Sequence, residues 1–248
     1  MNDSVGSIDV GGSNLRAVHA HLPAAHRDVE VLSVDRRRHG TIHSGDVRSD
    51  DLSRYNVIRH DHLRHAFAIL GLPEFLSCVA VPLLCRIGDE WHAGRFSPAQ
   101  EHFASGVLYD IIVERMRAFT PRDDAPRILI ATPAGERHAI GAALVGAGAA
   151  VEGWRVIYLG VDLPAQEIVA AAIAGKVSVV ALSVLYVEDR KQILGELRSV
   201  RSHLPSGIPL FVGGSGALTL ARELSAPGIR VSDNVAELYD ELRRSREI

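Results

Sequence analysis

Five short apolar segments alternate with helix-length patterns through the second half of the chain. Strands are predicted at Arg127–Ala131, Trp154–Leu159, Val177–Leu182, Leu210–Val212 and Ile229–Val231. Helices are predicted between and after them at His138–Val151, Ala165–Ala174, Arg190–Ser202, Ala217–Leu224 and Asn234–Arg244. This alternation indicates an α/β fold, a Rossmann-like (flavodoxin-like) five-stranded parallel sheet over residues 125–248 with helices on both faces. Ligands bind such sheets at the carboxyl ends of the strands, so we expect the site in the loops after the first, third and fourth strands.

The segment before the sheet, residues 51–120, has the amphipathic spacing of a helical bundle. Pro82 lies inside one predicted helix and predicts a kink there, because proline donates no main-chain hydrogen bond. A break is expected over residues 89–96, and Ser97 has the residue type of an N-cap for the next helix. A polar segment bounded by prolines, residues 121–126, is expected to link the bundle to the sheet.

Residues 1–50 are polar and rich in His and Arg, and their sequence does not define a structure. A strand pair is expected at Gly6–Val10 and Val29–Val34. The segment Asp9–Arg16 is similar to the first phosphate loop of sugar kinases and related ATPases. No second phosphate motif follows, and the chain has no room for that fold. We therefore interpret this segment as a glycine turn between strands.

Composition narrows the class of protein. With 248 residues, 47% apolar residues and a formal net charge of −3, the chain resembles a globular protein and lacks the basic balance of a nucleic-acid binder. No uninterrupted apolar run reaches the roughly 18 residues of a membrane span, and no signal-peptide pattern opens the chain. We therefore expect a cytoplasmic protein that does not bind a membrane.

A Glu-x-His-x-x-Gly motif, formed by Glu136, His138 and Gly141, directly follows the first predicted strand. At this place the imidazole is lifted over the edge of the sheet. A carboxylate two residues earlier can accept the second ring hydrogen and fix the tautomer, as a metal-bound imidazole requires. Gly141 removes a side chain where the start of the helix must admit another group. The motif alone leaves two alternatives open, a surface loop and a nucleotide-binding loop, although the Gly-x-Gly-x-x-Gly spacing is absent.

Two further motifs, Ser183-x-Leu185 and Gly213-Gly214, end the third and fourth predicted strands. In this order and at these strand ends, the three motifs resemble the cobalamin-binding domain family over residues 127 to about 245. The resemblance implies that His138 replaces the cofactor's own dimethylbenzimidazole as lower cobalt ligand, with Glu136 as its orienting partner. It also implies a channel for the displaced nucleotide tail. The other expected cofactor-binding residues are Arg137, Gly141, Ser183, Leu185, Gly213 and Gly214.

The predicted bundle contains a second cluster, Trp91-His92 and, nine residues after the tryptophan, Glu101-His102. It resembles the helical cap of the light-responsive transcriptional repressors of the CarH type, which bind adenosylcobalamin. The resemblance implies that Trp91 and Glu101 pack over the upper-face adenosyl group, with His102 supporting the same wall. It also implies that His92 becomes the upper cobalt ligand once light has expelled that group. A flat indole suits stacking on adenine, and a carboxylate can accept hydrogen bonds from ribose hydroxyls.

Those repressors begin with a winged helix-turn-helix. Here fewer than about 60 residues precede the bundle, and they show no such pattern and no basic recognition helix. We therefore expect no direct DNA binding. The sequence predicts a cobalamin-dependent sensor, not an enzyme, in which light cleaves the Co–C bond and alters a homo-oligomer or a protein-partner interface. The alternative is a corrinoid methyl carrier of a methyltransferase system. A third hypothesis, a bilin bound by the N-terminal region, has no specific residues behind it.

Overall fold

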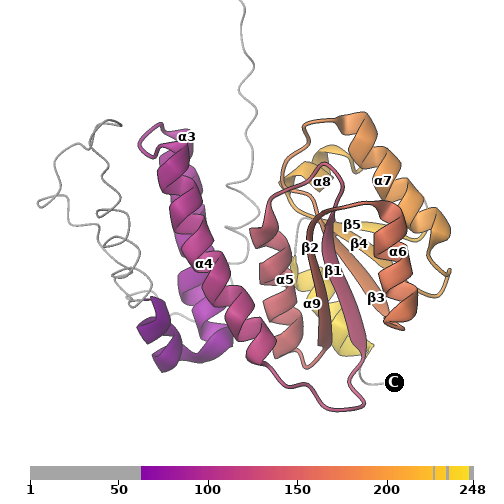
Figure 1. Cartoon of the computed structure of the whole chain (residues 1–248), viewed down its shortest axis with the longest axis horizontal. Helices are drawn as coiled ribbons and strands as arrows, with labels where there is room; N and C mark the ends of the chain where they lie inside the picture. The colour runs from indigo at the N-terminus through magenta and orange to yellow at the C-terminus, as the bar shows by residue number, and fades with distance from the viewer. Residues whose placement is uncertain (1–62, 226, 233–234, 246–248) are drawn as a thin grey trace, which may run out of the picture.

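The computed structural model describes residues 63–225, 227–232 and 235–245 of the chain. The strand pair and the glycine turn predicted within residues 1–50 lie outside these ranges. In the described part, helices are followed by a five-stranded parallel sheet with helices on both faces, the fold class that the alternating patterns predict (Figure 1).

The helical part consists of helical residues 63–75, a π-helical turn η2 (Leu76–Ala80), α3 (Val81–His92) and α4 (Pro98–Ala118). A π turn lies directly before Pro82, the residue at which the sequence predicts a kink. There the N–H of Val81 bonds to the carbonyl of Leu76, five residues back. Pro82 lies directly after this turn, inside the continuous helical stretch from Leu63 to His92, and has no N–H to donate to the preceding turn.

Helix α4 begins where the sequence predicts. The Ser97 hydroxyl accepts a hydrogen bond from the Gln100 N–H, and the Gln100 side chain accepts one from the Ser97 N–H, which is a capping box. The break predicted over residues 89–96 is wrong at its start, because α3 continues to His92. Trp91 and His92 therefore stand in the last turn of a helix.

The sheet contains β1 (Arg127–Pro133), β2 (Arg155–Leu163), β3 (Val179–Ser183), β4 (Leu210–Gly213) and β5 (Ile229–Ser232), in the order β2-β1-β3-β4-β5. The remaining helices are α5 (Ala139–Val151), α6 (Ala165–Ala174), α7 (Arg190–His203), α8 (Ser215–Thr219) and α9 (Val235–Arg244). This is the flavodoxin-like strand order, with its switch point between β1 and β3. The helix predicted at 217–224 is wrong in its bounds, because α8 starts directly after Gly214 and is only five residues long.

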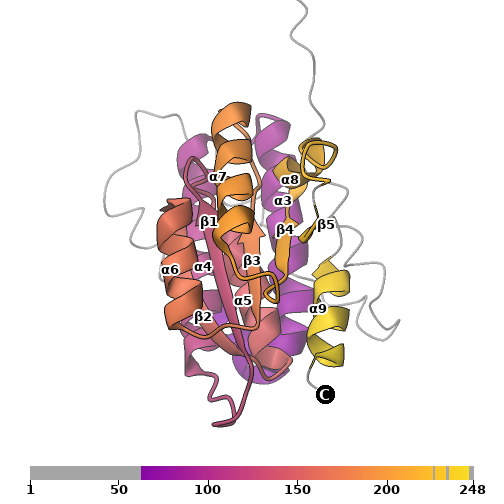
Figure 2. The ribbon, with the colours of Figure 1, turned by 90° about the vertical axis from the view of Figure 1, so that its right-hand side faces the viewer.

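Alternate residues of β1 face opposite layers of helices. Ile128 and Ile130 pack with α5 and α9 on one face, whereas Leu129 and Ala131 pack with α6 and α7 on the other (Figure 2). A central parallel strand buried on both faces reads as a continuous apolar run, which is how β1 appears in the sequence.

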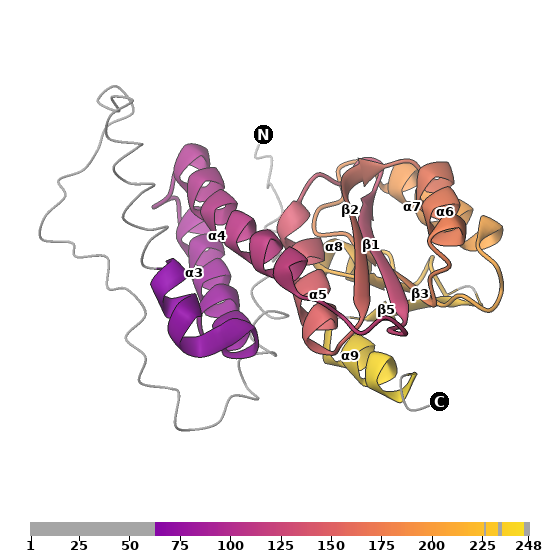
Figure 3. The same ribbon diagram turned by 60° about the horizontal axis from the view of Figure 1, so that its bottom comes forward.

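The bundle packs on the outer side of α5 (Figure 3). Ala143 and Ala147 of α5 share one buried cluster with Leu108 and Ile111 of α4. Other α5 residues, such as Ala142, face the sheet. Helix α5 is thus buried on two sides, which explains its small residues: they let the sheet and α4 both approach its backbone closely.

One helical stretch, Leu63–His92, is long and apolar enough by length and composition to cross a membrane, although it contains no uninterrupted apolar run of that length. Core helices of soluble proteins pass the same test. Leu63, Phe75 and Leu84 of this stretch belong to the buried cluster shared with α4 and α5. The stretch is therefore weak support for a membrane span.

Candidate functional site

The carboxyl ends of the strands lie at the same end of the molecule as the turn between α3 and α4 (Figure 1). Strand β1 ends at Pro133, and the N–H of Glu136 bonds back to the Pro133 carbonyl to close a turn. Gly135 in this turn has φ 90°, a left-handed conformation that favours glycine. Helix α5 then begins with His138 as its N-cap residue. The turn thus delivers Glu136 and His138 to the switch point of the sheet.

The Glu136 carboxylate is buried, with 1% of the residue exposed, and it accepts four hydrogen bonds. Oε1 accepts from the His138 N–H at 2.7 Å and from His138 Nδ1 at 2.6 Å. Oε2 accepts from the N–H groups of Leu185 at 2.6 Å and Tyr186 at 2.8 Å. Burial raises the pKa of Glu136, but the hydrogen bonds from His138 and Tyr186 outweigh it, and the pKa lies below its ordinary value. An ionised carboxylate therefore ties the loop after β1 to the loop after β3.

This carboxylate sets the state of the His138 ring. Because an ionised carboxylate only accepts hydrogen bonds, Nδ1 carries the proton, and the lone pair of the neutral ring lies on Nε2. The hydrogen bond to Glu136 raises the pKa of His138, burial opposes the rise, and the charges of Glu136 and Glu101 add to it. The His138 side chain is 55% exposed and meets the Tyr186 ring edge-on, with centroids 6.2 Å apart. Nε2 is thus a preset nitrogen donor at an accessible edge of the sheet.

Two residues that sequence reasoning missed hold the main chain of the same loop. Asp162, near the end of β2, accepts a hydrogen bond from the Gly135 N–H at 2.8 Å, and its own N–H donates to the Glu136 carbonyl at 3.1 Å. Thr132 is fully buried; its hydroxyl donates to the same carbonyl and accepts from the Asp162 N–H at 2.9 Å. The exposed Arg137 lies 3.4 Å from Asp162. The sequence could have indicated them only through their place in the predicted strands, because both residues lie near the carboxyl end of a strand.

The residues expected to line the tail channel gather around the start of α5 and the ends of β3 and β4: Gly141, Ser183, Leu185, Gly213 and Gly214. A Cβ on Gly141 would lie 2.6 Å from Ser183 Oγ, so a side chain there would collide with β3. Gly214 has φ 104°, and a Cβ on it would lie 2.4 Å from the Val184 carbonyl oxygen. Ser183 is 7% exposed, and its hydroxyl bonds to no other residue in the described ranges. Because the residue is largely buried and the hydroxyl remains free to bond, Ser183 suits contact with a polar ligand.

The four candidate residues of the bundle lie on either side of the turn between α3 and α4. Trp91 is 46% exposed and meets the His92 ring edge-on at 4.8 Å. His92 Nδ1 donates to the Gly88 carbonyl at 2.8 Å when the neutral ring is protonated there, which leaves its lone pair on Nε2. Glu101 and His102 pair at 2.5 Å, and the His102 ring is 82% exposed. The charge of Glu101 raises the pKa of His138. The start of α4 therefore lies within electrostatic range of the loop after β1.

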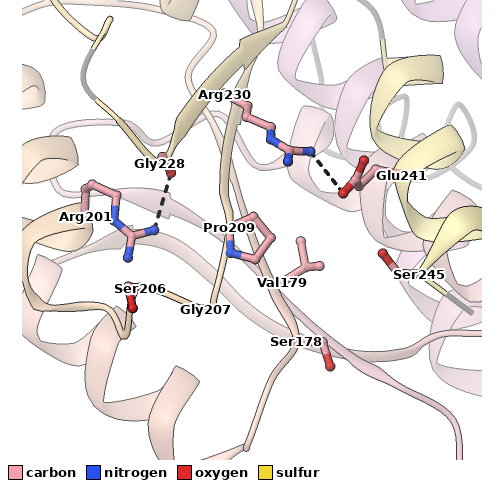
Figure 4. Close-up of a pocket in the computed structure, with 10 residues that line it drawn as sticks. All are labelled: Ser178, Val179, Arg201, Ser206, Gly207, Pro209, Gly228, Arg230, Glu241 and Ser245. Atoms are coloured by element: carbon pink, nitrogen blue, oxygen red, sulfur yellow. Dashed lines mark hydrogen bonds and ion pairs between the residues drawn. The ribbon is translucent and has the colours of Figure 1, made fainter. Parts of the chain in front are cut away.

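A pocket of about 430 Å³ lies at the opposite edge of the sheet, among residues that precede β3, β4 and β5 (Figure 4). The guanidinium of Arg201 there donates to main-chain carbonyls, including those of Ile208 at 2.7 Å and Leu204 at 2.9 Å. Arg230 is paired with Glu241 at 3.1 Å. Both arginines are thus engaged in holding the fold, and the pocket is remote from the Glu136–His138 pair.

Nowhere in the described ranges do three His, Cys, Asp or Glu side chains gather to hold a metal ion by themselves. One oriented imidazole at an accessible edge of the sheet fits a metal macrocycle that brings its own equatorial ligands.

Comparison with known proteins points to the same chemistry. Residues 126–236 match the B12-binding family, the B12 binding domain. The HTH-type transcriptional repressors CarA and CarH of Myxococcus xanthus are similar to this chain, at 27% identity over 195 residues and 32% over 159 residues. These alignments cover 78% and 63% of the chain but 63% and 52% of the repressors, so the chain spans less than two thirds of either relative. In fold, the chain resembles the monomethylamine corrinoid protein of Methanosarcina barkeri, with a TM-score of 0.61, 16% identity, and coverage of 78% of this chain and 93% of that one.

Proposed function

On the premise that residues 126–236 form a B12-binding domain, we propose that this protein binds cobalamin through His138 and acts as a cobalamin-dependent regulator. One observation carries the ligand assignment. The buried Glu136 carboxylate accepts the Nδ1 proton of His138 at 2.6 Å, so the ring offers its Nε2 lone pair to a metal. A carboxylate in this position also makes the imidazole a stronger donor.

We assign the cofactor's nucleotide tail to the region around the start of α5. Gly141 packs directly against Ser183, and Gly214 packs against the Val184 carbonyl, whereas Gly213 leaves more open space. The Ser183 hydroxyl is available to a polar group of the tail. Leu185 supplies an apolar wall while its N–H secures Glu136. Arg137, exposed beside His138, is assigned to the rim of the same site.

The upper face of the cofactor is assigned to the turn between α3 and α4. Trp91, almost half exposed, offers an indole for an adenosyl group to cover, and Glu101 offers carboxylate oxygens for ribose hydroxyls. His102 orients Glu101 through their 2.5 Å contact. His92 is assigned as the upper ligand after illumination, because its Nδ1 bond to the Gly88 carbonyl leaves Nε2 as the donor.

The regulatory output in this proposal is a movement of the bundle. Adenosylcobalamin, when bound, supplies a cobalt–carbon bond that visible light breaks. With that group gone, Trp91 would lose its contact and α3 and α4 could change their packing on α5, which would alter a homo-oligomer or partner interface. The similarity to two transcriptional repressors supports a regulatory, non-enzymatic role. The proposal places the protein in the cytoplasm.

Illumination of the loaded protein tests this function. The full chain is loaded with adenosylcobalamin in the dark, and its absorption spectrum and its size by light scattering are compared before and after green light. Hydroxocobalamin-loaded protein, which has no adenosyl group, is the control. We expect spectrum and size to change in the first sample only. The photoreceptor proposal is wrong if light changes neither property of the adenosylcobalamin sample.

The alternative, a methyl carrier, makes a different prediction. Protein loaded with methylcobalamin would then pass the methyl group to an acceptor when a partner methyltransferase is supplied. Its spectrum would report the turnover. Such transfer, together with an absence of any light response, would favour the carrier over the sensor.

A further inference from the structure

We propose that Asp162 is a positioning residue for His138, acting through the main chain of the loop after β1. This inference deepens the proposed function and rests on it for the role of His138 as a ligand. The residue lies on β2, which is neither of the two strands whose loops the Glu136 carboxylate ties together.

Glu136 is held at both of its ends. Its carboxylate is fixed by the N–H groups of Leu185 and Tyr186, from the loop after β3. Its main-chain carbonyl is fixed by the Thr132 hydroxyl and by the Asp162 N–H. The contacts to the carboxylate position the acceptor for His138 Nδ1. The contacts to the carbonyl position the main chain two residues before His138. The second set of contacts acts on the main chain that carries His138, and the side chain of Asp162 adds a contact to Gly135 in the same turn.

Asp162 contributes both its side chain and its unusual backbone. Its φ of 58° is in a region that aspartate and asparagine tolerate better than other side chains. Its N–H donates to the Thr132 hydroxyl and to the Glu136 carbonyl. Its Oδ1 then accepts from the Gly135 N–H at 2.8 Å, one residue before Glu136. Its Oδ2 is 3.4 Å from the exposed Arg137, a contact that solvent screens. The hydrogen bond to Gly135, more than the charge, is therefore the contact that positions the loop.

Three variants separate these contributions. Asp162→Asn keeps the backbone preference and an oxygen acceptor for Gly135 but removes the charge. Asp162→Gly keeps the left-handed conformation but removes the acceptor. Arg127→Ala is the matched control, because it removes a side-chain bond to a main-chain group, the Gly175 carbonyl at 2.9 Å, at the opposite edge of the same sheet.

Two measurements on the full chain test the proposal. Amide hydrogen exchange without cobalamin reports the Gly135 and His138 N–H groups directly. Hydroxocobalamin titration reports affinity and, from the absorption spectrum, whether imidazole is the lower ligand. For Asp162→Gly we expect faster exchange at Gly135 and about a tenfold loss of affinity, at the low end for residues that orient a metal ligand. We expect a smaller imidazole-bound fraction as well. Asp162→Asn and Arg127→Ala are expected to match the wild type in all three.

Wild-type exchange and affinity in Asp162→Gly would overturn the inference. An equal loss in Asp162→Asn would also overturn it, because charge would then be what matters. If the wild type binds no cobalamin, the proposed function fails, whereas the exchange measurement still decides whether Asp162 holds the loop.

Discussion

Replacing Glu136 by glutamine exchanges one buried carboxylate oxygen for an NH₂ group, which can settle in either of two orientations. If the amide keeps its oxygen toward His138, the N–H groups of Leu185 and Tyr186 both lose their acceptor. If the amide instead keeps its oxygen toward the N–H groups of Leu185 and Tyr186, only the His138 N–H loses its acceptor, and the NH₂ group can donate to His138 Nδ1. The second arrangement costs less, so we expect it to predominate.

The magnitude comes from one unsatisfied, partly buried N–H group. Such a group costs about 1–3 kcal/mol, so we expect Glu136→Gln to lower the free energy of unfolding by about 2 kcal/mol at pH 7. For a chain of this length that corresponds to a fall in Tm of roughly 4–8 °C. Because the pKa of Glu136 is lowered in the folded state, its stabilisation is present above the carboxyl's unfolded pKa of about 4.3 and is lost as the pH falls through the folded pKa. The gap between wild type and variant should therefore narrow below about pH 4.

The ring of His138 gives a second readout. An amide donating to Nδ1 moves the ring proton to Nε2, and ¹⁵N NMR of histidine-labelled, ligand-free protein distinguishes the two tautomers. His138→Ala assigns the resonance. Glu188→Gln is the matched control, because Glu188 is exposed in the same loop after β3 and the charge change is identical. Unchanged stability together with an unchanged Nδ1–H tautomer in Glu136→Gln would refute the reasoning.

Three further predictions concern the same region. Gly214→Ala should lower the free energy of unfolding in urea by about 1–3 kcal/mol, because φ is 104° and the new Cβ would meet the Val184 carbonyl. Gly207→Ala, with open space around it, should lower it far less. Equal losses in the two variants would contradict the packing described. Trp91→Ala should change the free energy of unfolding by less than about 1 kcal/mol, since the side chain is almost half exposed. It should weaken the binding of adenosylcobalamin more than that of hydroxocobalamin. Equal weakening of both would contradict the placement of Trp91 at the upper face of the cofactor. In an NMR titration of the ligand-free protein, the pKa of His138 should lie above the ordinary value of about 6.5. The stability that the folded protein gains from the His138–Glu136 pair is therefore present below pH 6.5 and is lost as the pH rises through the folded pKa. A midpoint below about 6.5 would contradict the pairing with Glu136.

The sequence was most informative where the pattern is local and repetitive. The alternation of buried strands and helices predicted all five strands and the parallel sheet, because β1, β3 and β4 are buried on both faces and read as apolar runs. The spacing of Glu136 and His138 predicted their contact, since two residues span a single turn at a strand end.

Contacts between distant segments were harder to predict. The second oxygen of Glu136 binds Leu185 and Tyr186, about 50 residues away, and nothing in a one-dimensional pattern specifies that pairing. Asp162 stands at a strand end where a polar residue carries a signal, but the motifs after the first, third and fourth strands give no indication that the second strand contributes to the same loop. The close approach of Gly216 in α8 to the backbone of Leu185 is another contact between distant segments that the pattern does not specify.

The central claim is that a nitrogen of His138 is the lower ligand of cobalt. Electron paramagnetic resonance of the bound cofactor, reduced to cobalt(II), tests it most directly, because a coordinated ¹⁴N splits each cobalt line into three and ¹⁵N splits it into two. In protein labelled with ¹⁵N only in histidine, we predict two-line splitting, absent in labelled His138→Ala. Three-line splitting in the labelled wild type would show that the cofactor's own base is bound and would contradict the account.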